Sequence, residues 1–165
     1  MAEPILRVTS DVRRDLLASA MQFKNEATVV WEYVVNSLQY VDRGVIPAIQ
    51  VVVDQADKSI SISDNGLGMT ADDLLHYFRM HGENRERLLG RVGRGKFGTG
   101  KSAAFGIGRE LRVDTRRDRL RNVVSLNREM INASKGDEIP LAWEVRDEPC
   151  ESTTGTKVTV GGVVL

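Results

Sequence analysis

Apolar positions recur every three or four residues over the first quarter of the chain. This period predicts two amphipathic helices, one over residues 11–22 and a longer one that begins at Asn25 or Glu26 and stops at Gly44. The apolar positions of these helices are Val12, Leu16, Leu17, Ala20, Val29, Val30, Tyr33, Val34, Val35, Leu38 and Val41.

The period changes to two farther along the chain. Ile60 and Ile62 point to one side of an expected strand, and the serines between and beside them point to the other. Strands are expected over residues 48–54, 58–63, 111–115, 123–126, 141–145 and 156–160. Between the second and third of these strands, Thr70 is expected to cap a helix that runs to about Met80, and a short helix is expected over 102–107.

The order of these elements indicates the fold class. Helices and a hairpin come first, one helix follows, and most of the remainder is strand at hairpin-like spacing. This order predicts an α+β fold, a two-layer sandwich with a mixed, mostly antiparallel sheet and helices on one face. The 165 residues, 41% of them apolar, fit one domain over 1–165.

Composition narrows the classes of protein. The 23 basic and 23 acidic residues cancel, so net charge gives no argument for nucleic acid and leaves that partner undetermined. No apolar run approaches the roughly 20 residues of a membrane helix, and no secretory signal opens the chain. Cys150 is the single cysteine, which fits a reducing, cytoplasmic setting. The basic residues gather in 85–101 and 112–121, and the second group is expected to be a solvated face.

Three segments carry candidate chemistry. Glu32 and Asn36 stand four residues apart and so share one face of the long helix, where a carboxylate can activate water and an amide oxygen can bind magnesium. The segment 64–69 reads Asp-Asn-Gly-Leu-Gly-Met and follows a strand. Its aspartate can accept a hydrogen bond from an exocyclic amine, its glycines let a flat ring approach the backbone, and Met69 offers an apolar contact. The glycine-rich run 90–100 leads into a helix start, which presents free amides to phosphate.

Each segment taken alone also has an ordinary explanation. The glutamate and asparagine can face solvent, the Asn-Gly pair can be a simple turn, and the glycine run can be a linker. Residues 95–102 in addition match the P-loop pattern G-x-x-x-x-G-K-[ST] letter for letter. A P-loop follows a buried parallel strand, and the charged stretch 83–91 cannot form one, so a P-loop NTPase is only the remote alternative.

In this order and at these spacings the segments resemble the ATPase superfamily of gyrase, the heat-shock chaperone, histidine kinases and MutL, whose domain has the Bergerat fold. The resemblance implies that Glu32 is the general base, that Asn36 holds magnesium, and that Asp64 reads the adenine amine. It covers about residues 11–160. Where the family often has N-x-x-D, this chain has Gln39 in place of the aspartate.

The resemblance is nearest to the heat-shock chaperones, whose phosphate loop ends a mobile lid, expected here at about residues 82–95. The late Gly-Thr strand would place its threonine by the adenine. The residues expected to bind the nucleotide are Asn36, Asp64, Gly66, Gly68, Met69, Gly95, Lys96, Phe97, Gly98, Thr99, Gly100, Lys101 and Thr156.

The implied function is hydrolysis of ATP with magnesium, slow in isolation and coupled to lid closure. The alternatives are a non-catalytic ATP-dependent switch and the catalytic domain of a split histidine kinase. The only histidines are His76 and His81, both after the aspartate box, so the chain is not a complete kinase. The expected partners are ATP and either an ATP-dependent homodimer or a C-terminal domain beyond residue 165, and no membrane.

Overall fold

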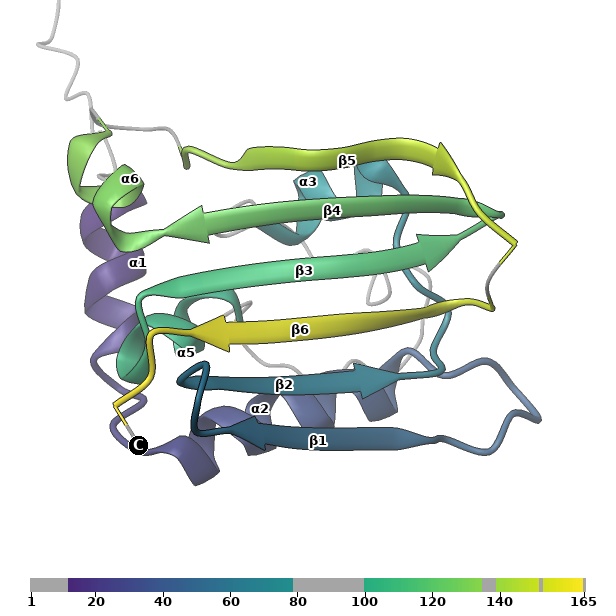
Figure 1. Ribbon diagram of the computed structural model, residues 1–165, viewed down its shortest axis with the longest axis horizontal. Coiled ribbons are helices and arrows are strands. Elements are labelled where there is room, and N and C mark those ends of the chain that lie inside the picture. Colours follow the sequence, from purple (N-terminus) through teal and green to yellow (C-terminus); the bar gives the residue numbers. More distant parts are fainter. Residues whose placement is uncertain (1–11, 79–99, 135–138, 152, 165) are drawn as a thin grey trace, which may run out of the picture.

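A computed structural model describes residues 12–78, 100–134, 139–151 and 153–164. Six strands form one sheet in the order β1-β2-β6-β3-β4-β5, and the helices α1, α2, α3 and α5 lie behind it in Figure 1. The strands are β1 (Ile49–Asp54), β2 (Ser59–Asp64), β3 (Glu110–Arg117), β4 (Leu120–Asn127), β5 (Ala142–Pro149) and β6 (Gly155–Gly161). The helices are α1 (Val12–Ala20), α2 (Glu26–Gln39), α3 (Ala71–Phe78), α5 (Gly100–Ile107) and α6 (Arg128–Ala133).

The predicted α+β sandwich is confirmed, with one refinement. Every strand pairing in the described sheet is antiparallel, so the sheet is not mixed. A P-loop needs a parallel strand to lead into it, and none of the described strands is parallel to another, which disfavours the P-loop alternative. No helix in the described ranges is long and apolar enough to cross a membrane.

Local sequence signals account for most helix starts. Asn25 caps α2 by accepting a 2.8 Å hydrogen bond from Thr28 N. Thr70 and Asp73 cap α3 reciprocally, each side chain accepting a bond from the other's backbone N–H. Helix α6 was not predicted from the sequence, although Asn127 caps it in the same way as Asn25 caps α2.

The end of α2 corrects a prediction. The helix stops at Gln39, so the expected stop at Gly44 is wrong and Val41 lies outside the helix. Tyr40 leaves the helical conformation, and its carbonyl accepts a 2.8 Å bond from Leu67 N. A tertiary contact thus takes one of the carbonyls that a longer helix would need.

The core lies between the sheet and the helices. Ile60 and Ile62 of β2 are buried in it, as their alternation with serines predicts. The same face of β3 contributes Leu111 and Val113, and α5 contributes Phe105. The alternate residues of β3 therefore face away from the helices.

A charged network covers that outer face of the sheet. Asp114 accepts two hydrogen bonds from Arg121, at 3.1 and 2.8 Å, and lies within 4 Å of Arg112 and Arg116. Arg112 also pairs with Glu144 at 2.8 Å. Three arginines of the second basic group thus surround a carboxylate that is almost fully buried.

Replacing Asp114 by asparagine is expected to destabilise the fold by about 1–3 kcal/mol at neutral pH, because the surrounding arginines lose their counter-charge. Burial opposes the charge of Asp114, but the hydrogen bond from Arg121 and the charges of Arg116 and Arg112 hold its pKa below the usual value of 3.8. Its stabilisation is therefore present above about pH 4 and is lost as pH falls through the lowered pKa.

Urea unfolding between pH 7 and pH 3 would measure this effect. The exposed Glu151, changed to glutamine, serves as the control and should leave stability within about 0.5 kcal/mol of wild type. An Asp114→Asn chain as stable as wild type at pH 7 would contradict the expectation.

Candidate functional site

The end of β2 holds the aspartate that the sequence singled out. The Asp64 carboxylate accepts hydrogen bonds from Ser37 Oγ at 2.8 Å, Gly66 N at 2.9 Å and Thr156 N at 3.2 Å. A carboxylate offers about four acceptor positions, so three donors fix its orientation and still leave room for one more donor. The group is set to accept a hydrogen bond from a ligand amine.

The turn after Asp64 packs against two distant backbone segments. A Cβ on Gly66 would lie 2.9 Å from Tyr40 O, at the end of α2. Gly68 has φ +68°, and a Cβ there would collide with Arg116 O in β3. Both glycines are therefore required by the packing of the protein itself, whereas the sequence suggested that they make room for a flat ring.

A row of polar residues crosses the helix-covered face of the sheet from Asp64. The register places Thr156 beside Asp64, Thr115 beside Thr156 and Asn122 beside Thr115. The hydroxyls of Thr115 and Thr156 lie 2.9 Å apart, and Met69 N donates to Thr115 Oγ1 at 2.8 Å. The row thus crosses the four strands β2, β6, β3 and β4, and Met69 connects it to the turn that follows Asp64.

Sequence reasoning missed Ser37 and Thr115 as members of this site. Ser37 directly follows Asn36 and occupies the buried face of α2, so its place beside the Glu-x-x-x-Asn pair was a usable signal. No signal in the sequence pointed to Thr115, because only the strand register brings it opposite Thr156.

Helix α2 forms a second wall of the site. Glu32 and Asn36 are both half-buried on the same helical face, as their spacing predicts. Burial raises the pKa of Glu32 above its usual 4.5. Burial also raises the pKa of Tyr77 in α3, and the nearby charge of Glu32 adds to that rise. A carboxylate in such a setting is a better proton acceptor than one in water.

Lys101 occupies an unexpected position in the first turn of α5. Its side chain is buried, and its ammonium donates a 3.1 Å hydrogen bond to Tyr77 O in the last turn of α3. A cation at a helix C-terminus is favourable, although burial lowers the pKa of Lys101 to about 8. The lysine ties the start of α5 to α3, and its expected contact with phosphate stays a prediction.

The remaining candidates are the residues that the sequence predicted to contact phosphate. Gly100 begins α5, two residues before the start at Ser102 that the sequence predicted. Gly95, Lys96, Phe97, Gly98 and Thr99, and the expected lid at about 82–95, lie outside the described residues.

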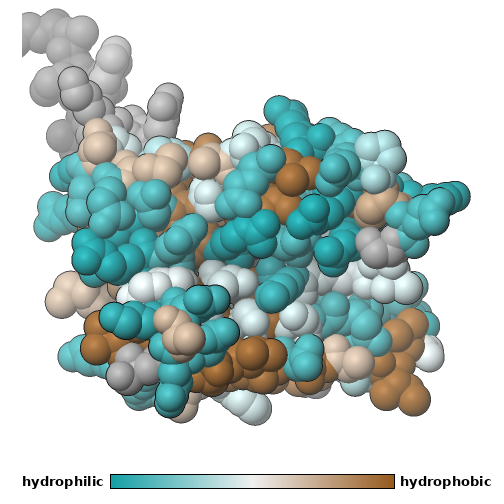
Figure 2. Space-filling model, viewed as in Figure 1, coloured by the Kyte–Doolittle hydropathy of each residue, from teal (hydrophilic) through white to brown (hydrophobic). Residues whose placement is uncertain are grey.

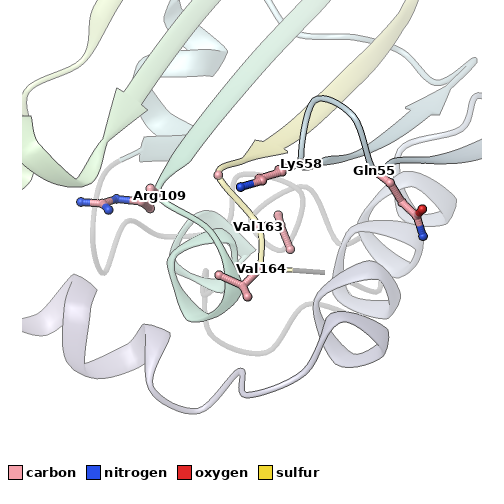
Figure 3. Close-up of a pocket in the computed structure, with 6 residues that line it drawn as sticks. Gln55, Lys58, Arg109, Val163 and Val164 are labelled. Atoms are coloured by element: carbon pink, nitrogen blue, oxygen red, sulfur yellow. The ribbon is translucent and has the colours of Figure 1, made fainter.

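One cavity of the described chain lies away from Asp64. It has a volume of about 530 Å³ and lies at the β1–β2 turn, where Lys58, Arg109 and Val163 line it (Figure 3). Asp64 is at the other end of β2 from this turn. The cavity therefore contains none of the predicted site residues.

The protein oxygens of this site suit a magnesium ion that keeps several waters and shares its ligands with substrate phosphates. Within the described ranges no three His, Cys, Asp or Glu residues gather into a group that could hold a metal ion. Magnesium usually keeps several waters and takes one or two protein oxygens together with substrate phosphates. The Asn36 amide oxygen is a fitting ligand of this kind.

Comparison with known proteins identifies a protein family whose model matches most of the chain. A family model described as "Histidine kinase-, DNA gyrase B-, and HSP90-like ATPase" matches residues 23–156, most of the chain. The match begins before α2 and extends into β6, so it includes Glu32, Asp64 and Thr156. No curated protein matches the chain.

Proposed function

Because the chain belongs to the family of histidine kinase-, DNA gyrase B- and HSP90-like ATPases, we propose that it binds ATP through Asp64 and hydrolyses it through Glu32. The observation that carries the proposal is the Asp64 carboxylate, fixed by three donors with one acceptor position left. The exocyclic amine of adenine is the donor that fits that position.

The other roles follow from the two walls of the site. Asn36 supplies the protein oxygen for magnesium, which would neutralise phosphate charge when bound. Glu32 stands one helical turn away and accepts the proton of the attacking water. Thr156 donates its N–H to Asp64, Met69 donates its N–H to Thr115 beside Thr156, and Met69 and Thr156 complete the adenine side.

The proposal also includes a lid, a phosphate loop and a partner for association. Residues 82–95 form a lid that closes over bound nucleotide, and residues 95–101 face the phosphates. Hydrolysis is slow in the isolated chain and depends on association, either with a second copy or with a further domain. These steps rest on the family resemblance and on the glycine-rich sequence of 90–100.

Selectivity for the base tests the proposal. Guanine carries a carbonyl where adenine has the amine, so the Asp64 carboxylate would face an acceptor in place of a donor. The chain is expected to bind ATP about tenfold to a hundredfold more tightly than GTP, in keeping with the loss of one hydrogen bond to a charged group. Calorimetric titration with magnesium and a nonhydrolysable analogue of each nucleotide measures the ratio. Equal affinities for the ATP and GTP analogues would show that Asp64 does not recognise adenine.

A further inference from the structure

Strand β1 is a free edge of the sheet. Among the residues that the structure describes, the sheet runs from β1 to β5, and β1 pairs only with β2 (Figure 1). An edge strand presents a row of backbone donors and acceptors that a further strand can use.

The register shows which residues of β1 face outward. Asn65 N donates to Ala48 O, and these residues continue the β1–β2 pairing by one position. Because hydrogen-bonded and non-bonded pairs alternate in an antiparallel ladder, Gln50 and Val52 bond to β2. The N–H and C=O groups of Ile49, Val51 and Val53 therefore point to the open side, where another strand would lie.

The side chains along this edge are apolar and uncovered. Val51 and Val53 are opposite Ile62 and Ile60 of β2, on the helix-covered face, yet they are 42% and 54% exposed. Figure 2 shows apolar residues along the lower border of the molecule, where β1 runs. This side of the sandwich is left without the helical cover that buries Ile60 and Ile62.

Helix α2 extends the apolar surface. Trp31 is 66% exposed and Leu38 is 45% exposed. At 100° per residue, both lie within about 60° of Val34, which packs against the core. Helix α2 contacts β1, β2 and α5, so it lies on the same side of the molecule as the β1 edge.

The opposite edge of the sheet is protected in ways that β1 is not. Strand β5 ends in Pro149, its pairing with β4 shifts register, and four of its eight residues are charged. Prolines, irregular pairing and charges are devices that prevent edge-to-edge pairing. Strand β1 has no proline, pairs regularly and carries one charge, Asp54, at its end.

We propose that β1 pairs antiparallel with β1 of a second copy of the chain, about a two-fold axis at Val51. The outward-facing residues are then self-complementary. Val51 faces its own copy and Ile49 faces Val53, so each chain contributes three residues to the new ladder. Asp54 lies opposite the neutral Ala48, and no like charges meet across the axis.

This pairing also brings the helices together. A two-fold axis perpendicular to the sheet keeps both helix layers on one face of a continuous twelve-stranded sheet, six strands from each copy. Strand pairing alone buries less than the roughly 800 Å² per partner of a stable interface. Trp31 and Leu38 of both copies flank the junction and supply the additional apolar area. The interface adjoins the nucleotide site, because Ile49 pairs with Asp64 on the other side of β1, but it uses neither Asp64 nor Glu32 and needs no nucleotide.

Two variants of one residue test the dimer. Val51→Lys places a charge in the interface. Val51→Pro removes an N–H that points outward, so it should block pairing with a second copy and leave the β1–β2 hairpin intact. Val164→Lys, at a valine that is 86% exposed and lies by the β1–β2 turn, outside the three residues of the proposed ladder, is the matched control.

Sedimentation velocity of the full chain, from low micromolar to several hundred micromolar and without nucleotide, is the measurement. Wild type and Val164→Lys are expected to show the same monomer–dimer equilibrium, and both Val51 variants to dissociate at least about tenfold more readily with unchanged melting. A wild-type chain that stays monomeric, or a folded Val51→Lys chain that dimerises like wild type, overturns the proposal. A Val51→Pro chain that unfolds overturns the outward assignment of the Val51 N–H, and with it the axis. ATP titration of the same samples reports on the nucleotide site separately.

Discussion

Glu32→Gln is expected to lower the rate of ATP hydrolysis by about 10²–10⁴-fold while ATP affinity stays close to that of wild type. Glutamine keeps the size and polarity of the side chain but cannot accept the proton of the attacking water. Because the carboxylate acts on water and not on the nucleotide, its loss should appear in turnover and not in binding. Single-turnover hydrolysis and calorimetric titration of the same preparations separate the two quantities.

The pH dependence of the hydrolysis rate identifies Glu32 as the general base. Burial raises the pKa of Glu32, so the wild-type rate should increase with pH through a value above 4.5, as the carboxylate loses its proton. The Glu32→Gln chain should lack this limb. Glu26→Gln, in the first turn of the same helix, is the matched control and should hydrolyse ATP at the wild-type rate. Undiminished hydrolysis by Glu32→Gln would falsify the general-base role and favour a nucleotide-dependent switch.

Asp64→Asn is expected to weaken ATP binding by about tenfold to a hundredfold and to abolish the preference over GTP. An amide has one oxygen, whereas the carboxylate uses both oxygens to accept bonds from Ser37, Gly66 and Thr156. Its NH₂ group would also face at least one of these donors or the adenine amine. The loss of ATP affinity therefore has two causes, the missing hydrogen bond to adenine and the disturbed hydrogen bonds from Ser37, Gly66 and Thr156.

A substitution of Ser37 distinguishes the contact between Asp64 and adenine from the hydrogen bonds that hold Asp64 in place. Ser37→Ala removes one donor and leaves the charge of Asp64, so binding should weaken by less than in Asp64→Asn while the base preference persists. Asp72→Asn, at an exposed position in α3, controls for loss of one negative charge. If Asp64→Asn binds ATP as tightly as Asp72→Asn does, adenine recognition lies elsewhere.

The local elements follow from short-range physics, and the sequence predicted most of them. Asn25 and Thr70 are N-caps because their side chains can reach backbone N–H groups within one turn. The alternation of Ile60 and Ile62 with serines fixed which face of β2 is buried. The ordered motifs around Glu32 and Asp64 indicated the family, which the match over residues 23–156 confirms.

The contacts that make a site were decided by the tertiary structure. Ser37 reaches Asp64 across 27 residues and Thr115 reaches Thr156 across 41, through helix packing and strand register that no local pattern specifies. The same applies to Tyr40, whose carbonyl ends α2 by bonding to Leu67, and to Lys101, whose buried ammonium bonds to the end of α3. A shift of one residue in a strand would turn every side chain to the other face, so such contacts exist only once the whole sheet has assembled.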